Sequence, residues 1–207
     1  RGIYRHQLSS VQFTITVDDF GVAYDNPEDV KHLIDTLQRH YESVTKYLGM
    51  TISHNVLARS ISLSMPDYIS RALARFNVSR NSGKPTDSPM AFTPVVYGEE
   101  SQLLEPDDCS ALLSPSEKKR IQEIIGVLLW FARCLDCTLY APLSKIGSHQ
   151  SKPTIRIKAM LDHLLQYVAC HPSPSLVFNP SDVLLQAHTG ASYLSEPHAR
   201  SRVAAHI

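Results

Sequence analysis

The chain has no net charge, few cysteines and no long apolar run, and each absence argues against a class of protein. Lys and Arg number 20, as do Asp and Glu, so the formal net charge is +0. This balance argues against a free-standing nucleic-acid binder held by overall basicity, although local basic patches are compatible with it. Four cysteines in 207 residues are too few for a disulfide scaffold and favour a reducing compartment.

Membrane and secretion signals are missing as well. No apolar run approaches the roughly 18 residues that a membrane span requires, and the chain does not open with a signal-peptide pattern. We therefore expect an intracellular protein, cytoplasmic or nuclear, with no membrane partner. The first residue is Arg1 and the last residues end within a pattern, so we also expect a piece of a longer protein.

Several common catalytic motifs are absent. The sequence contains no Gly-rich phosphate loop, no Gly-x-Ser-x-Gly elbow and no His-x-x-x-His pair. Cys134-x-x-Cys137 has no second pair of the same kind. A zinc or redox site there is the minor alternative to two thiols that pack as small hydrophobes.

The residues that are present indicate a globular protein with one or two domains. Hydrophobic residues make up 43% and charged residues 19% of the chain, and 207 residues can enclose a core. Strand-like and helix-like patterns both occur, which predicts the α+β class. The region from 77 to 113 is rich in proline, with no sustained period, and is expected to be a linker or an irregular crossing.

The stretch Phe13–Tyr24 organises the N-terminal part. Apolar residues alternate with polar ones on both sides of Asp18-Asp19, which predicts a β-hairpin with these two acids at its tip. Adjacent carboxylates repel each other unless a cation lies beside them, and Mg²⁺ takes oxygen ligands of this kind. The alternative is a solvated acidic turn.

Further elements follow this hairpin. A helix capped by Asn26 is expected from Pro27 to a last turn at Arg39–Tyr41. Strands are expected over Val44–Ile52 and Ser60–Met65. His54-Asn55 is assigned to the connection between those strands, and Ile61, Leu63 and Met65 to the inward face of the second. A helix is then expected after Pro66, with Ile69, Ala72, Leu73 and Phe76 on one face.

The C-terminal half is predicted to be helical before a last strand. Ser114-Pro115-Ser116-Glu117 forms a capping box, and the helix after it has a wide apolar stripe that includes Trp130 and Phe131. Two more helical patterns cover Leu139–Ser148 and Thr154–Ala169. Alternation over Asp182–His188 predicts a strand.

Two short motifs resemble reverse transcriptases. Val17-Asp18-Asp19 between apolar strands is similar to the Tyr-x-Asp-Asp metal-binding hairpin of that class, with Thr16 in place of the usual tyrosine. Tyr47-Leu48-Gly49 resembles the Phe-Leu-Gly that follows this hairpin in copia-type elements. In that family it belongs to the primer grip, whereas the structural alternative is an ordinary strand whose glycine allows close backbone approach.

An ordered series of blocks extends the resemblance along the chain. Ile125–Ala132, Leu135–Leu139 and His163–Tyr167 are similar to the Val-Gly-Ser-Leu-x-Tyr-x-Ala, Arg-Pro-Asp-Ile and Leu-x-Tyr-Leu blocks of copia-type LTR retrotransposon polyproteins. The resemblance implies an α+β fold with part of a reverse-transcriptase palm, a helical connection and the first strands of an RNase H-like sheet. The implied segments are residues 1–76 (palm and primer-grip region), 77–113 (Pro-rich linker or crossing), 114–180 (helical connection) and 181–207 (truncated start of the RNase H-like domain).

The family's chemistry gives these residues expected roles. Asp18 and Asp19 would be catalytic Mg²⁺ ligands for nucleotidyl transfer on an RNA or DNA template-primer, and Tyr47, Leu48 and Gly49 would be primer-grip residues. Gly190 occupies the position of an RNase H aspartate, and glycine cannot coordinate a metal.

The family's third carboxylate and nucleotide-binding parts lie before the hairpin. We therefore expect a fragment of an RNA-directed DNA polymerase that is inactive alone. The alternative is a catalytically inert retroelement remnant that acts as an interaction module. The sequence leaves the oligomeric state open.

Overall fold

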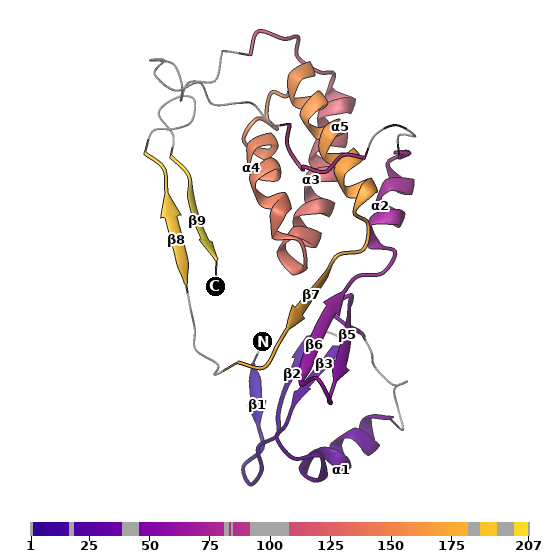
Figure 1. Ribbon diagram of the computed structural model, residues 1–207, viewed down its shortest axis with the longest axis vertical. Coiled ribbons are helices and arrows are strands. Elements are labelled where there is room, and N and C mark those ends of the chain that lie inside the picture. The colour runs from indigo at the N-terminus through magenta and orange to yellow at the C-terminus, as the bar shows by residue number, and fades with distance from the viewer. Residues whose placement is uncertain are drawn as a thin grey trace. The chain divides into compact units, whose positions relative to one another are not determined.

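The computed structural model combines α-helices with antiparallel sheets, which confirms the α+β class (Figure 1). The structure describes residues 2–16, 19–38, 46–80, 83, 85–91, 108–181, 187–193 and 201–206. By its internal contacts the chain forms two compact units. The first, here called the sheet unit, comprises residues 1–67 and 173–179, and the second, the helical unit, comprises residues 68–172 and 180–207. The four segments implied by the resemblance remain a prediction.

A three-stranded antiparallel sheet opens the sheet unit. It consists of β1 (Ile3–Arg5), β2 (Gln12–Thr16) and β3 (Asp19–Ala23), in that spatial order. The predicted hairpin is present, but Asp19 is a strand residue opposite Thr16 rather than a turn residue. Strand β3 therefore begins one position earlier in the chain than expected. Strand β1 was not predicted because three residues are too short to show alternation, yet Tyr4 stacks on Phe13 with ring centroids 5.1 Å apart.

Helix α1 (Pro27–Gln38) begins where the capping signal predicts. The side-chain oxygen of Asn26 accepts a hydrogen bond from the Glu28 amide at 3.1 Å, which satisfies one of the unpaired amides of the first turn. Pro27 needs no such partner because it has no N–H. Val30, in the next turn, is fully buried. The expected end of this helix, at Arg39–Tyr41, lies outside the described residues.

The second sheet has the order β4-β5-β6-β7. Its strands are β4 (Lys46–Tyr47), β5 (Met50–Asn55), β6 (Ser60–Ser64) and β7 (Ser175–Phe178), all antiparallel to their neighbours.

Several strand predictions need correction here. The expected single strand Val44–Ile52 is wrong, because a turn at Leu48-Gly49 separates β4 from β5. Both turn residues have positive φ, 53° and 79°, as the twist of a two-residue hairpin requires. The prediction for His54-Asn55 is also wrong, because both residues belong to β5. Of the expected inward residues Met65 is buried, whereas Ile61 is 41% exposed.

The helical unit contains four α-helices and a short 3-10 turn among its described residues. They are α2 (Tyr68–Arg75), α3 (Pro115–Cys134), η1 (Cys137–Leu139), α4 (Tyr140–Ser148) and α5 (Ile155–Cys170). The capping box is confirmed: Ser114 Oγ accepts from the Glu117 amide, and the Glu117 carboxylate accepts from the Ser114 amide. Strands β8 (His188–Ala191) and β9 (Val203–His206) form a separate antiparallel pair.

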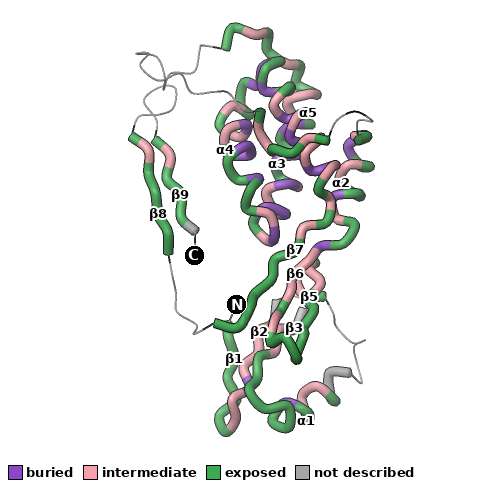
Figure 2. The backbone as a smooth tube through the Cα atoms, viewed as in Figure 1, coloured by how far each residue is buried: buried purple, intermediate pink, exposed green. Residues whose placement is uncertain are grey.

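The main hydrophobic core lies among the helices. Buried positions gather on α3, α4 and α5, whereas most strand residues are half-buried or exposed (Figure 2). On α3, Phe131 is fully buried and stacks on Tyr68 with ring centroids 5.5 Å apart. Trp130 was predicted to belong to the same stripe but is 43% exposed, because consecutive helical residues point about 100° apart.

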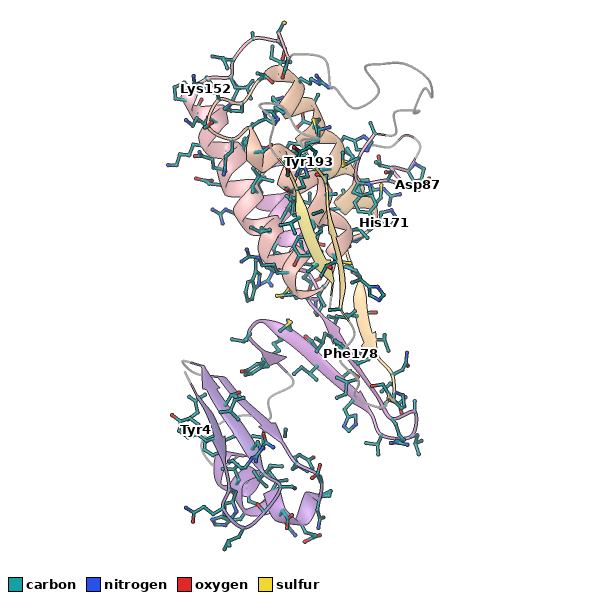
Figure 3. The ribbon with its side chains drawn as sticks, turned by 90° about the vertical axis from the view of Figure 1, so that its left-hand side faces the viewer. Tyr4, Asp87, Lys152, His171, Phe178 and Tyr193 are labelled. Carbon is teal, nitrogen blue, oxygen red and sulfur yellow. The ribbon has the colours of Figure 1, made fainter. Side chains whose placement is uncertain are left out.

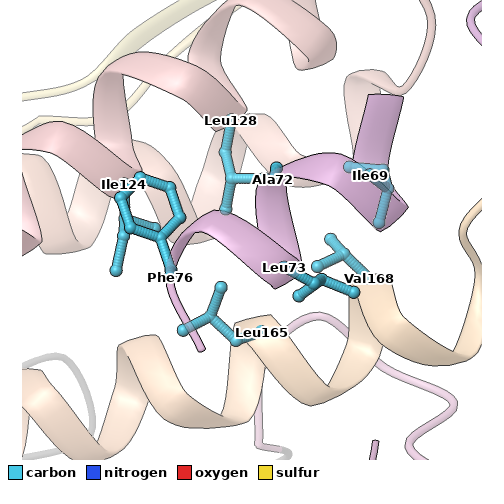
Figure 4. Close-up of a pocket in the computed structure, with 8 residues that line it drawn as sticks. All are labelled: Ile69, Ala72, Leu73, Phe76, Ile124, Leu128, Leu165 and Val168. Carbon is cyan, nitrogen blue, oxygen red and sulfur yellow. The ribbon is translucent and has the colours of Figure 1, made fainter. Parts of the chain in front are cut away.

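Helix α2 packs against α3 and α5 with little space to spare. The cavity between them has a volume of only about 10 Å³, comparable to a single water. Figure 4 shows its apolar lining, which comes from all three helices. A space this small and apolar is a packing gap rather than a ligand site. The lining residues are Ile69, Ala72, Leu73, Phe76, Ile124, Leu128, Leu165 and Val168.

A polar cluster ties residues 108–113 to the start of α5. Asp108 Oδ1 accepts from the amide and hydroxyl of Ser110, and its Oδ2 accepts from the Thr154 hydroxyl. Thr154 Oγ1 in turn accepts from the Ile157 amide and caps the helix. The hydrogen bonds from Ser110 and then Thr154 lower the pKa of Asp108 from its usual 3.8 to about 2, since they favour the carboxylate.

Acid should therefore weaken the helical unit through Asp108. The folded pKa lies below the unfolded one, so this contribution is complete above about pH 4 and is lost as the pH falls towards 2. We expect the difference in unfolding free energy between the parent chain and Asp108→Asn to be clear at pH 6 and to shrink towards zero near pH 2. Urea unfolding at a series of pH values measures it. A difference that does not depend on pH would contradict the assignment.

Candidate metal-binding hairpin and its tyrosine contact

In the sequence, the two predicted metal ligands come after the end of β2 at Thr16 and reach the start of β3 at Asp19. Asp18 lies outside the described residues, and for Asp19 the structure gives the backbone alone, as the first residue of β3. Asp19 is the ladder partner of Thr16. The hairpin itself is therefore established, and the coordination role of the two carboxylates stays a prediction.

Tyr47 connects the second predicted motif to this hairpin. Its hydroxyl is 3.0 Å from Thr14 Oγ1, within hydrogen-bonding distance. Thr14 is the ladder partner of Gly21, so the contact reaches both strands of the hairpin. The tyrosine ring passes close to Gly21, because a Cβ built on that glycine would lie 3.3 Å from Tyr47 Cε2 and Cζ.

Gly21 is the residue that the sequence interpretation missed. A Cβ there would also lie 2.9 Å from Thr14 Oγ1, closer than real Cβ atoms come to other heavy atoms. Glycine at this position thus allows the tyrosine to approach the strand, one of the recognised reasons for glycine inside a strand. The signal available in the sequence was a glycine within a predicted strand, Gly21 between the apolar residues Phe20 and Val22.

Leu48 and Gly49 have a structural role in the β4–β5 turn. No atom lies within 4 Å of a Cβ built on Gly49, so the explanation by close backbone approach is wrong for this residue. Its φ of 79° is the reason for glycine. Of the three primer-grip candidates, Tyr47 therefore makes the hydrogen bond to the hairpin, while Leu48 and Gly49 close the turn beside it.

Gly190 lies within strand β8, opposite Ala204. The expected strand Asp182–His188 was predicted to end at His188, whereas His188 is the first residue of β8. Residues 182–186 of that expected strand lie outside the described residues. Gly190 is exposed, and no atom lies within 4 Å of a Cβ built on it. Packing therefore does not require glycine there, and a side chain such as aspartate would fit.

The remaining candidates have structural roles. Asp136 caps η1 by accepting from the amide and hydroxyl of Thr138. All four cysteines are free, and burial raises the pKa of the Cys134 thiol. No group of three or more His, Cys, Asp or Glu side chains that could hold a metal occurs in the described part of the chain. That part also contains no helix long and apolar enough to cross a membrane.

Comparisons with protein-family models, curated proteins and solved structures give no match to this chain. The resemblance to copia-type elements thus depends on the residues and motifs themselves. The geometry adds one observation to them: Tyr47 contacts both strands of the acidic hairpin.

Proposed function

We propose that this chain is part of the RNA-directed DNA polymerase of a copia-type LTR retrotransposon, and that Asp18 and Asp19 bind Mg²⁺ for nucleotidyl transfer. In this proposal the sheet unit contains the C-terminal part of a reverse-transcriptase palm. Helices α3 to α5 form the connection that follows it, and β8 with β9 begins an RNase H-like sheet. The natural partner is an RNA or DNA template-primer.

The observation that supports this most is the contact of Tyr47 with Thr14 and Gly21. The resemblance assigns the acidic hairpin and the Tyr47 segment to the same substrate, the end of the primer. Two segments that serve one primer terminus need to be held together, and a tyrosine hydrogen-bonded to Thr14 with its ring close to Gly21 supplies such a link. A solvated acidic turn alone would not require it.

The donor chemistry fits the ion. Two adjacent carboxylates supply hard oxygen ligands, which Mg²⁺ prefers. When bound, the ion would supply Lewis-acid activation of the primer 3′-hydroxyl. Asp18 and Asp19 would bind it, while Tyr47 braces the strands that position them. Two carboxylates are only part of the coordination that this chemistry needs, so we assign the activity to the intact parent enzyme and expect none from the 207 residues alone.

A second candidate function has one observation in its favour. Gly190 offers no oxygen at the proposed RNase H position, although the strand has room for an aspartate there. A catalytically inert remnant that acts as an interaction module would tolerate this loss. Retained metal binding at Asp18 and Asp19 separates the polymerase proposal from this one, because an inert module has no need of it.

Metal binding by the hairpin is the direct test. Mn²⁺ is a suitable probe because it shares the oxygen preference of Mg²⁺ and broadens the NMR signals of nearby amides. We expect substoichiometric Mn²⁺ to broaden the amides of Thr16 and Phe20 in the intact chain. Added Mg²⁺ should restore these signals by competition. The double variant Asp18→Asn with Asp19→Asn should lose the broadening.

The matched control is the other adjacent acidic pair of the sheet unit, Glu28 and Asp29 at the start of α1. Replacing them by Gln and Asn should leave the broadening at the hairpin unchanged. A primer-template duplex should increase the apparent Mn²⁺ affinity of the hairpin, since its phosphates can complete the coordination. Equal broadening at both acidic pairs would favour the solvated turn and reject the proposal. An apparent Mn²⁺ affinity that does not change when the duplex is added would do the same.

A further inference from the structure

Strand β7 forms an unprotected edge of the second sheet. Among the described residues, no strand pairs with its outer side, and all four of its residues are exposed. Leu176, Val177 and Phe178 are 39%, 50% and 52% exposed, and Figure 3 labels Phe178 on this strand. Natural edge strands usually contain charges that prevent pairing, yet residues 172–181 include no Lys, Arg, Asp or Glu.

The sheet next to this edge has one apolar face. Because alternate strand residues share a face, the register forms two cross-strand rows on the same side. One row contains Ile52, Leu63 and Leu176, and the other contains His54, Ile61 and Phe178. The opposite face is mostly hydroxylic. It presents Thr51, Ser53, Ser62, Ser64 and Ser175, together with Val177.

We propose that β7 pairs in antiparallel fashion with β7 of a second copy of this chain, about a two-fold axis at Val177. A backbone edge is complementary to itself under such an axis, since the unpaired N–H and C=O groups of one strand meet those of the other. The two sheets then form one continuous eight-stranded sheet. This association is independent of the proposed polymerase role.

The register follows from two constraints. Paired residues of an antiparallel ladder lie on the same face, so the apolar faces match only when the two residue numbers have an even sum. Pro174 and Pro180 bracket the strand, and proline cannot donate a ladder hydrogen bond. Among the registers with an even sum, only the one centred at Val177 pairs all five residues between the two prolines, 175–179. It places Leu176 opposite Phe178 of the second copy and joins the apolar rows of the two sheets.

The charge of this surface favours a second copy over a charged partner. The edge and both apolar rows contain no Lys, Arg, Asp or Glu, so two copies meet without like-charge repulsion. An acidic or basic partner would find no opposite charge on these residues. The cross-strand contacts of Leu176 with Phe178 are of the aromatic–aliphatic kind that stabilises antiparallel pairs.

Sedimentation velocity over a range of concentrations tests the proposal on the full chain of 23.1 kDa. We expect a concentration-dependent species of twice that mass. Val177→Lys should abolish it, because the two-fold axis places the two ammonium groups directly opposite each other. Leu57→Lys is the matched control: Leu57 is 98% exposed in the β5–β6 connection of the same sheet, and its replacement should leave the dimer intact.

A mixing experiment guards against an effect of misfolding. Val177→Lys and Val177→Glu should each be monomeric alone, while their mixture should regain the dimer through a central ion pair. Dimer recovery only in the mixture supports the β7 pairing. A parent chain that is monomeric at all concentrations, a Val177→Lys variant that remains dimeric, or a mixture that stays monomeric would overturn it.

Discussion

Replacing Phe131 by alanine should lower the free energy of unfolding of the helical unit by about 3–5 kcal/mol, the usual range for a buried phenylalanine. The ring is fully buried on α3 and stacks on Tyr68, with a 9° angle between the two planes. Tyr68 is itself fixed by a hydrogen bond from its hydroxyl to the Val127 carbonyl at 3.0 Å, so the surroundings cannot collapse easily into the space left. Urea unfolding followed by the helical circular dichroism signal measures the loss.

Trp130 provides the control on the adjacent residue of the same helix. It is 43% exposed, and Trp130→Ala should cost about 1 kcal/mol or less, because exposed positions rarely contribute more. The larger side chain should thus have the smaller effect. Equal losses of unfolding free energy for the two variants would mean that α3 presents a different face to the core. Trp130 would then belong to the buried stripe, as the sequence predicted.

The helical unit could be predicted well because its signals are local. Ser114 and Glu117 determine the start of α3 through hydrogen bonds within one turn, and Thr154 does the same for α5. The apolar period of each long helix then identifies most of its buried residues. Trp130 shows the limit of that approach, since a wide stripe does not tell which of two neighbouring residues lies at its margin.

The sheets were harder to predict because their partners lie far apart in the sequence. Strand β7 pairs with β6, more than 100 positions earlier, and four residues are too few for a periodic signal. The turn at Leu48-Gly49 was hidden for a different reason: leucine rarely adopts a positive φ, so Gly49 was the one local sign of a hairpin there.

The candidate site divides in the same way. Adjacent carboxylates between alternating runs are visible in the sequence, and the hairpin of β2 and β3 is present in the fold. The link from Tyr47 to Thr14 and Gly21 could not be predicted, because it joins two sheets through residues 26 or more positions apart. Only Gly21, within β3, indicated that another group lies close to this strand.

Gly21→Ala should therefore destabilise the sheet unit by about 1–3 kcal/mol, as overpacking of a well-packed contact usually does. The added methyl group would lie 2.9 Å from Thr14 Oγ1 and 3.3 Å from the Tyr47 ring. Relief requires movement of the side chains that join β4 to the hairpin. Gly190→Ala is the matched control in another strand: no atom lies near its Cβ, so alanine should be neutral or stabilising by up to about 1 kcal/mol.

A double-mutant cycle identifies the origin of the cost. Thr14→Ala removes the atom nearest to the new methyl group, so Gly21→Ala should cost clearly less in that background than in the parent chain. The difference between the two costs is the coupling free energy between the residues. A coupling near zero would place the strain elsewhere and remove the evidence that Gly21 is needed for the approach of Tyr47. Because that approach is the main support for a shared primer site, the cycle tests the structural basis of the polymerase proposal without requiring activity.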